Sequence, residues 1–299
     1  MEVSVVVPTL NDREELRGCL DALAAESPAE VVVVNGPSTD GTSGMVRDRD
    51  DVAVLVEVDD RNVNAARNAG LDRARGDVVA FVNPSLTVES GWHGAVVDAL
   101  SDADAVTGPT HEQLQAGVAT DTAESRRIRG RTVTYFNGGN VAFTDETLED
   151  IDGFDERLDV GGARDAAHRI AGVDREVAWS AEMCVAREAA ADGGRTERGW
   201  RSRYRSLTYR LAKNYGPHPT VVIRTLRHAL DDAASAFRDV ARGDAKPTVW
   251  LGNGRDVAVG GVSGFTDGLR ARYADRSPAR NPAGWSDRTD RAVAVYDRR

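Results

Sequence analysis

The chain has 299 residues, enough for one large α/β domain with an appendage or for two smaller domains. Its net charge of −10 argues against a general nucleic-acid-binding protein, whose surface must attract phosphates. The sequence contains no apolar stretch of about 18 residues, the length that a transmembrane helix needs, so no such helix is predicted. The apolar run 3–7 has neither a basic region before it nor a small-residue cleavage site after it, so it does not indicate a signal peptide. We therefore expect a cytoplasmic protein.

The basic residues are unusual in kind. Of 38 lysines and arginines only Lys213 and Lys246 are lysines, and aspartate is abundant. A dense acidic surface keeps a protein soluble where salt screens charge, so this composition favours a halophilic protein. Drift in a GC-rich genome is the alternative. Cys19, Cys184 and the five histidines show no metal-ligand spacing, which predicts buried thiols and no metal site built on these residues.

The first hundred residues alternate between strands and helices. Runs of β-branched residues predict strands buried on both faces of a sheet, at 3–7, 31–34, 52–58 and 78–82. Apolar residues at helical spacing predict helices between them, at 12–25, 42–49 and 64–75. This alternation predicts a mainly parallel sheet with helices on both faces. Ligands of such sheets bind at the carboxyl ends of the strands.

The pattern loosens in the second half. We expect a helix at 89–100, a polar irregular loop at 111–131, a helix at 163–171 and a strand at 177–186. Residues 195–227 then hold nine basic residues and one acid. Glycine-rich residues 252–268 predict a loop, and the last thirty residues or so are expected to be irregular. We therefore expect a domain at 1–190, a basic amphipathic helical segment at 195–242 and an irregular tail at 243–299.

Four blocks, in order, resemble family 2 of the glycosyltransferases. They are 3–11 (VSVVVPTLN), 31–42 (VVVVNGPSTDGT), 65–77 (AARNAGLDRARGD), and 137–143 (NGGNVAF) followed by 153–157 (GFDER). Each block is weak alone, whereas four in order make a specific match that covers roughly residues 1–190. The resemblance implies a GT-A fold, Rossmann-like and mainly parallel, with a C-terminal helical appendage. It also implies inverting transfer of a sugar from a nucleotide donor.

The resemblance implies roles for residues in these blocks. By this resemblance the donor site would comprise Pro8, Thr9, Asn35, Asp40 and Arg67, with Asn83 and Ser85 after the fourth predicted strand. Asn137, Gly138, Gly139 and Asn140 would line the acceptor side. Each role has a plainer alternative. Asp40 could cap a turn, Arg67 could be a solvated helix residue, and 137–140 could be an ordinary turn.

Two acidic motifs of the family are missing. The aspartate pair that binds the diphosphate metal is replaced by Asn83 and Ser85, whose neutral oxygens bind hard cations weakly. The prediction of a Mn or Mg cofactor is therefore weakened, and no residue is assigned as a metal ligand. Arginine could neutralise the diphosphate instead. The acidic pair that supplies the catalytic base aligns with Gly162 and Ala163, neither of which takes a proton.

Three interpretations of this loss stay open. Asp165 and His168 follow the lost base within two turns, so they are the candidate catalytic residues. A non-catalytic relative that binds or scaffolds is the second interpretation. An alignment shifted by a few residues is the third, and would make Asp159 or Glu89 the missing acid.

The basic segment predicts contact with a membrane. Trp200, Tyr204, Leu207 and Leu211 share one helical face, and a second helix is expected after Pro219. Basic side chains beside an apolar face describe a helix on an anionic membrane surface. The predicted surface residues are Trp200, Arg201, Arg203, Tyr204 and Arg205. A helix packed on the main domain, with a solvated basic edge, is the alternative.

These observations predict a glycosyltransferase that acts on a lipid-phosphate-linked or surface-glycan acceptor. We expect it at the inner face of the cell membrane as a peripheral protein, with no nucleic-acid partner. If the composition reflects a halophile, protein N-glycosylation is a natural pathway. A non-catalytic subunit is one alternative. A nucleotidyltransferase is another, disfavoured because no glycine-rich triphosphate loop lies near the N-terminus.

Overall fold

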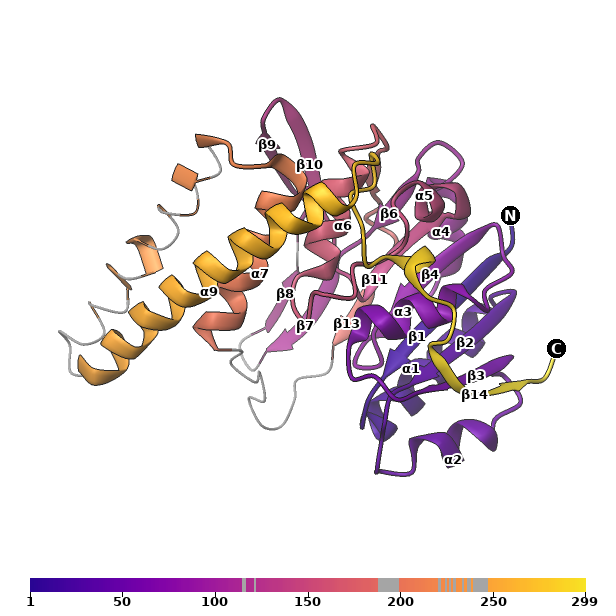
Figure 1. Cartoon of the computed structure of the whole chain (residues 1–299). Coiled ribbons are helices and arrows are strands. Elements are labelled where there is room, and N and C mark those ends of the chain that lie inside the picture. Colours follow the sequence, from indigo (N-terminus) through magenta and orange to yellow (C-terminus); the bar gives the residue numbers. More distant parts are fainter. Residues whose placement is uncertain are drawn as a thin grey trace. The chain divides into compact units, whose positions relative to one another are not determined.

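The fold is described from a computed structural model of the chain (Figure 1). The described residues are all except 115, 116, 121, 188–198, 239–246 and the positions 220, 221, 224, 226, 228, 229, 233, 236 and 237. Side chains are also not described at 113, 114, 117–119 and 247–253. The chain forms two compact units. The first comprises 1–157, 162–193 and 283–299, and the second comprises 158–161 and 194–282.

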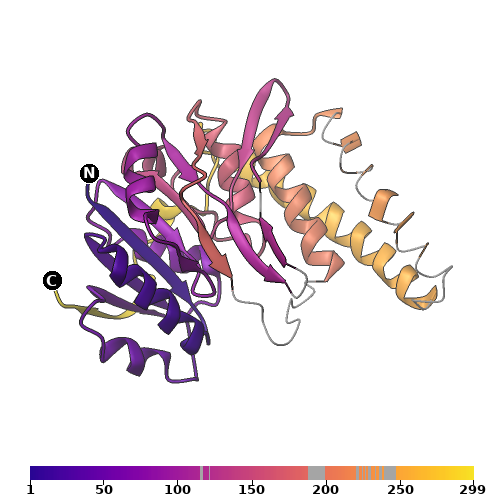
Figure 2. The ribbon, with the colours of Figure 1, turned by 180° about the vertical axis from the view of Figure 1, so that it is seen from behind.

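The first unit is built on an eight-stranded sheet of order β12-β6-β11-β4-β1-β2-β3-β14 (Figures 1 and 2). Its parallel centre comprises β1 Val3–Thr9, β2 Glu30–Asn35, β3 Val54–Val58 and β4 Val78–Val82. On one side, β11 Asn140–Thr144 runs antiparallel to β4 and to β6 Ala105–Thr107, and β12 Val177–Trp179 runs parallel to β6. The predicted mainly parallel α/β sheet is confirmed.

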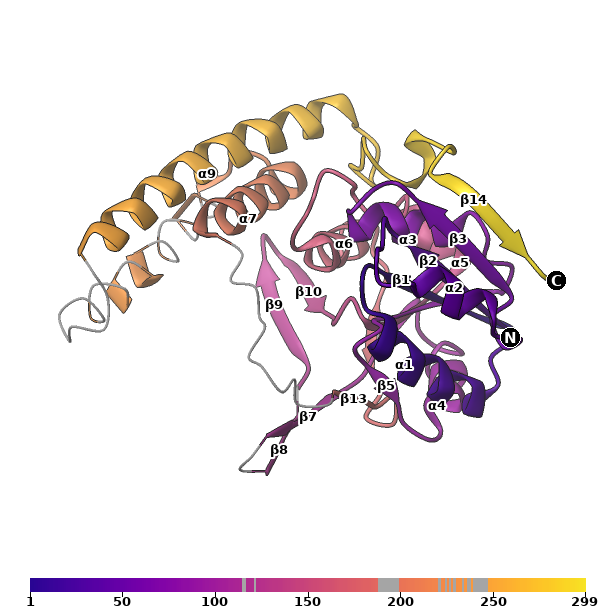
Figure 3. The same cartoon turned by 90° about the horizontal axis from the view of Figure 1, so that it is seen from below.

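Helices cover both faces of this sheet (Figure 3). Alternate residues of a strand point to opposite faces, so Val5 and Val6 meet different helices. Val5 packs in a buried cluster with Leu20 of α1 and Trp92 of α4. Val6 faces α3, where Gly70 permits close approach, because a Cβ there would lie 2.3 Å from Val6 Cγ1. The helices of this unit are α1 Arg13–Glu26, α2 Thr42–Arg47, α3 Val63–Leu71, α4 Trp92–Ala99, α5 Asp145–Asp150, α6 Gly162–Ile170 and the short η1 Trp285–Asp287.

The expectation of an irregular loop at 111–131 is wrong. Its described residues form two antiparallel strand pairs, β7 Thr110–Leu114 with β8 Gly117–Thr120, and β9 Glu124–Ile128 with β10 Arg131–Tyr135. The expected strand at 177–186 is also two elements, because β13 Val185–Arg187 joins a second sheet of order β5-β13-β7-β8, with β5 at Thr87–Val88. Most side chains of β9 and β10 are not buried, so cross-strand pairing rather than burial on both faces stabilises these two strands.

The C-terminus returns to the first unit, contrary to the expected irregular tail. β14 Ala292–Asp297 pairs antiparallel with β3 and extends the sheet by one strand. Just before it, Arg291 is buried, and its Nε lies 2.6 Å from Glu156 Oε1. Arg291 also donates to the carbonyl oxygens of Gly284 and Trp285. An arginine-rich, aspartate-rich segment therefore orders itself by ion pairing and strand addition, which apolar periodicity does not reveal.

The second unit contains two long helices that pack side by side, α7 Trp200–Tyr215 and α9 Pro247–Ala274 (Figure 1). The glycine-rich stretch 252–268, expected as a loop, lies within α9. Gly260, Gly264 and Gly268 follow one another at four-residue spacing on one helix face. A Cβ at these positions would lie 2.1–2.4 Å from backbone oxygens of α7. Glycine here serves close backbone packing rather than a turn. The helix expected after Pro219 lies partly outside the described residues.

Substituting glycines of α9 tests this packing. We expect Gly264→Ala to lower the free energy of unfolding by about 1–3 kcal/mol, because its Cβ would meet Arg205 O at 2.1 Å. Gly254→Ala on the same helix adds a Cβ to open space and should raise stability by up to about 1 kcal/mol. Urea denaturation of both variants measures the difference. Equal effects would contradict the close approach of α7 and α9.

Candidate functional site

The carboxyl ends of β1 and β2 carry buried polar side chains, as predicted. Thr9 and Asn35 are paired in register across the two strands. Asn35 Oδ1 accepts a hydrogen bond from Ser38 Oγ at 2.6 Å, and Asn35 Nδ2 donates to Ser43 Oγ at 2.9 Å. The Thr9 hydroxyl is buried and has no hydrogen-bond partner among the described residues. A buried hydroxyl without a partner is costly, so this end of β1 is suited to receive a polar ligand.

Asp40 shapes the loop that follows β2. Its Oδ1 accepts from the backbone N–H and hydroxyl of Thr42, and its Oδ2 accepts from the backbone N–H of Arg13. Burial raises the pKa of this carboxyl, but the hydrogen bonds from Thr42 and Arg13 together lower it by more than burial raises it. The pKa therefore lies below its ordinary value. Asp40 therefore does cap a turn. Its role in donor binding stays a prediction.

Arg67 on α3 is a buried guanidinium, not a solvated one. Its Nη1 donates to Asn64 Oδ1 at 3.0 Å and its Nη2 to Gly138 O at 2.7 Å. Among the described residues it forms no ion pair, and its Nε has no hydrogen-bond partner. Burial lowers the pKa of Arg67 to about 10. A buried cation whose described partners are all neutral favours a site that takes an anion. Asn64, one turn before Arg67, is a positioning residue that the sequence analysis missed.

The turn at 137–140 meets Arg67 and the end of β4. A Cβ on Gly138 would lie 2.8 Å from Ala163 Cβ and 2.9 Å from Arg67 Nη2. A Cβ on Gly139 would lie 2.5 Å from Asn83 Cβ. Only glycine leaves room at these two positions, so predicted donor-side and acceptor-side residues do come together here.

Asn137 and Asn140 differ in what they can offer a ligand. Asn137 is half-buried, and its Nδ2 donates to Thr110 Oγ1 at 3.0 Å. Asn140 is fully buried, its Oδ1 accepts from Trp92 Nε1, and its Nδ2 donates to Met183 O. The expectation that Asn140 lines an acceptor site is therefore corrected, because its amide holds α4 and the chain before β13 in place.

The end of β4 does not fit a diphosphate-binding metal. Asn83 Oδ1 accepts hydrogen bonds from both the backbone N–H and the hydroxyl of Ser85, at 3.0 and 2.9 Å. The carboxamide and hydroxyl thus bond to each other, and both oxygens are neutral. Mg²⁺ and Mn²⁺ favour charged oxygen ligands.

Asp165 and His168, predicted as catalytic, lie on α6 and are buried, with 0% and 1% of their surface exposed. Asp165 Oδ2 forms an ion pair with Arg169 Nε at 2.8 Å, and Arg169 Nη1 donates to the backbone oxygen of Ile151. The ring of His168 packs edge-on against Tyr135. A general base must reach the hydroxyl it deprotonates. The catalytic assignment is therefore corrected to a structural one, because α6 turns both groups into the protein.

The predicted membrane-surface residues on α7 differ in how far they are exposed. Tyr204 is buried, and its hydroxyl donates to Asp232 Oδ2 at 2.6 Å, so the apolar stripe packs within the second unit. Trp200 is half-buried, whereas Arg201, Arg203 and Arg205 are exposed. This corrects the expectation for Tyr204. None of the helices among the described residues is long and apolar enough to span a bilayer.

The mainly parallel sheet covered by helices on both faces, with polar side chains at its strand ends, is an α/β architecture that solved GT-A glycosyltransferases share. Residues 4–151 match the sequence model of Glycosyl transferase family 2. This match places residues 4–151, about half of the chain, in glycosyltransferase family 2. Glycosyltransferase AglE of Haloferax volcanii is 29% identical over 150 residues, which cover 47% of this chain. The match covers 42% of AglE itself, so the chain spans less than half of this relative's length.

Solved structures share the fold over most of the chain. Mannosyltransferase PcManGT of Pyrobaculum calidifontis, in complex with GDP-Man and Mn²⁺, gives a TM-score of 0.58 at 21% identity and covers 89% of this chain and 87% of its own. S. aureus TarS 1–349, in complex with UDP-GlcNAc, gives a TM-score of 0.61 at 16% identity and covers 92% of both chains. At these identities the likeness shows the fold alone.

Proposed function

We propose that the chain transfers a sugar from a nucleotide-sugar donor to an acceptor hydroxyl. The observation that carries this proposal is the buried guanidinium of Arg67 beside Gly138 and Gly139, at the edge where β1, β2 and β4 end. A donor diphosphate would supply the negative charge that Arg67 lacks among its described contacts. Family membership and the donor-bound structural neighbours support the same ligand class.

The reaction needs few steps. The acceptor oxygen attacks the anomeric carbon, the bond to the diphosphate breaks, and the acceptor proton passes to a base. Arg67 would hold the departing diphosphate, and the backbone at 137–140 would border the acceptor. No residue of α6 is assigned as the base, because Asp165 and His168 are buried. This observation favours a non-catalytic, nucleotide-binding subunit as the second candidate function.

The acceptor is proposed to carry a lipid. The second unit has an apolar cavity of about 450 Å³, with lining residues that include Tyr204, Val222, Val257, Val262 and Phe265. Exposed arginines 201, 203 and 205 of α7 lie on the same unit and could attract a lipid phosphate. A peripheral position at the inner membrane face, a halophilic origin and a part in N-glycosylation remain predictions.

Nucleotide binding should stabilise the chain without added metal. We expect one of UDP, GDP and dTDP, at about a hundred times its dissociation constant, to add about 2.7 kcal/mol to the free energy of unfolding. The reason is that Arg67 is available to the diphosphate and the end of β4 is not suited to Mg²⁺ or Mn²⁺. Thermal melts with each nucleotide, with and without either ion, measure this. A shift that requires the ion would show that metal ligands lie elsewhere.

Turnover separates the candidate functions. Release of a nucleoside diphosphate from a nucleotide sugar, with an acceptor extract present, identifies a transferase. Binding without release indicates the non-catalytic subunit. Release of pyrophosphate from a nucleoside triphosphate would identify the nucleotidyltransferase instead. No stabilisation by any nucleotide would contradict the donor site itself.

A further inference from the structure

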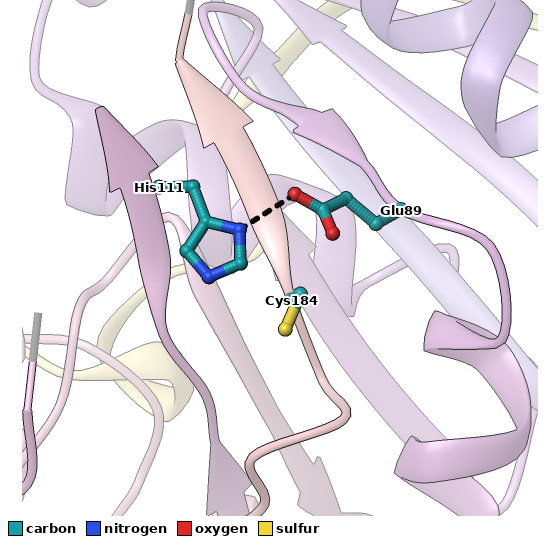
Figure 4. Close-up of side chains that lie close together, drawn as sticks. All are labelled: Glu89, His111 and Cys184. Carbon is teal, nitrogen blue, oxygen red and sulfur yellow. Dashed lines mark hydrogen bonds and ion pairs between the residues drawn. The ribbon is translucent and has the colours of Figure 1, made fainter. Parts of the chain in front are cut away.

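Three side chains of metal-ligating type meet outside the site described above. They are the carboxylate of Glu89, the imidazole of His111 and the thiol of Cys184 (Figure 4). One potential ligand atom from each lies within 4.8 Å of the other two. The three residues are far apart in sequence, so no spacing motif indicates them. The expectation that Cys184 is buried is wrong, because this thiol is half-buried.

Strand register brings these residues together. β13 lies between β5 and β7, and its Val185 pairs with Val88 of β5 and Thr110 of β7. Glu89, Cys184 and His111 are the chain neighbours of these three paired residues. The backbone N–H of Glu89 also donates to Cys184 O at 3.0 Å. The backbone therefore sets the positions of the three Cα atoms, which leaves little entropy to lose when a ligand is bound.

The cluster is accessible and its internal bonds are displaceable. The side chains of His111 and Glu89 are 31% and 41% exposed, and His111 Nδ1 lies 2.8 Å from Glu89 Oε1. Cys184 Sγ donates to Ala181 O at 2.9 Å. Burial raises the pKa of the Cys184 thiol, and the negative charges of Glu89 and Glu182 raise it further. These charges disfavour a free thiolate nucleophile and favour a bound cation.

We propose that Glu89, His111 and Cys184 form a binding site for a divalent metal of the zinc type. Sulfur, nitrogen and oxygen ligands together suit Zn²⁺, whereas Mg²⁺ and Mn²⁺ favour oxygen alone. Binding releases the thiol proton to solvent and replaces the bond between His111 and Glu89. Three protein ligands leave a fourth tetrahedral position for water or a substrate atom. The metal would tie β5, β7 and β13 together, and this proposal does not depend on the proposed transferase activity.

Zinc and cobalt serve as probes of the full-length chain. After treatment with a chelator, it should bind one zinc ion, measured by elemental analysis after gel filtration. Co²⁺ should add a thiolate-to-cobalt charge-transfer band to the absorption spectrum. Cys184→Ser should abolish that band, and His111→Gln should weaken zinc binding by at least about tenfold. Cys19→Ala and His93→Gln remove the same residue types elsewhere and should leave both signals unchanged.

The outcomes decide the proposal. Circular dichroism and urea midpoints first confirm that each variant is folded. Loss of the cobalt band in Cys184→Ser and weakened zinc binding in His111→Gln, with both controls intact, support the site. Zinc binding that persists in Cys184→Ser and His111→Gln, or a spectrum without the charge-transfer band, overturns it. Glu89→Gln should weaken zinc binding while keeping the cobalt band, because the thiolate remains.

Discussion

Asp165→Asn is expected to lower the free energy of unfolding by about 3–5 kcal/mol, because it leaves the buried Arg169 guanidinium without its carboxylate. Both side chains are 0% exposed, so water cannot solvate the charge that remains. Urea denaturation followed by circular dichroism measures the change. This loss is a large part of the stability of a typical domain, about 5–15 kcal/mol.

Two controls separate a structural role from a catalytic one. Glu14→Gln removes an exposed pair with Arg17 on α1 and should cost no more than about 1 kcal/mol. Asp165→Leu combined with Arg169→Met removes both buried charges and should recover much of the loss. If Asp165→Asn were as stable as the parent chain but lost turnover, the catalytic assignment of Asp165 would be reinstated.

Arg67→Met is expected to weaken nucleotide binding by about 10- to 100-fold, the effect of losing a charged hydrogen-bonding partner of roughly 1.5–3 kcal/mol. The methionine keeps an apolar stem over the ring of Phe154. In the parent chain the Arg67 Cζ atom lies 4.9 Å from the centroid of this ring. Isothermal titration with the nucleotide that stabilises the parent chain most measures the change in affinity.

Arg67→Lys tests whether charge alone suffices. Lysine keeps the charge but cannot reproduce the forked contact to Asn64 and Gly138, so we expect intermediate affinity. Arg17→Met, at an exposed position of α1, is the matched control and should bind nucleotide like the parent. Unchanged affinity in Arg67→Met would remove the main support for the donor site.

Sequence patterns located the centre of the fold well. The runs at 3–7, 31–34 and 78–82 are strands of the sheet, because a strand buried on both faces must be continuously apolar. The same reasoning placed Thr9 and Asn35 together, since parallel strands end at one edge. It also identified the family before any coordinates, through four short blocks in order.

Patterns located the periphery poorly, for reasons particular to each element. Glycines at 260, 264 and 268 indicate a loop by composition but form a helix face, because their partner is the backbone of α7. The paired strands β9 and β10 carry few apolar residues, so they are specified by pairing rather than by burial.

The sequence by itself determined the central parallel sheet, the polar ends of its strands and the absence of an acid at positions 83, 85, 162 and 163. These are local properties, because each depends on residue type and short-range periodicity. Only the tertiary structure decided that Asp165 and His168 face inward, that Arg67 is buried beside Gly138, and that Glu89, His111 and Cys184 meet. Side-chain direction and strand register are set by packing between segments distant in the chain, which spacing along the chain does not encode.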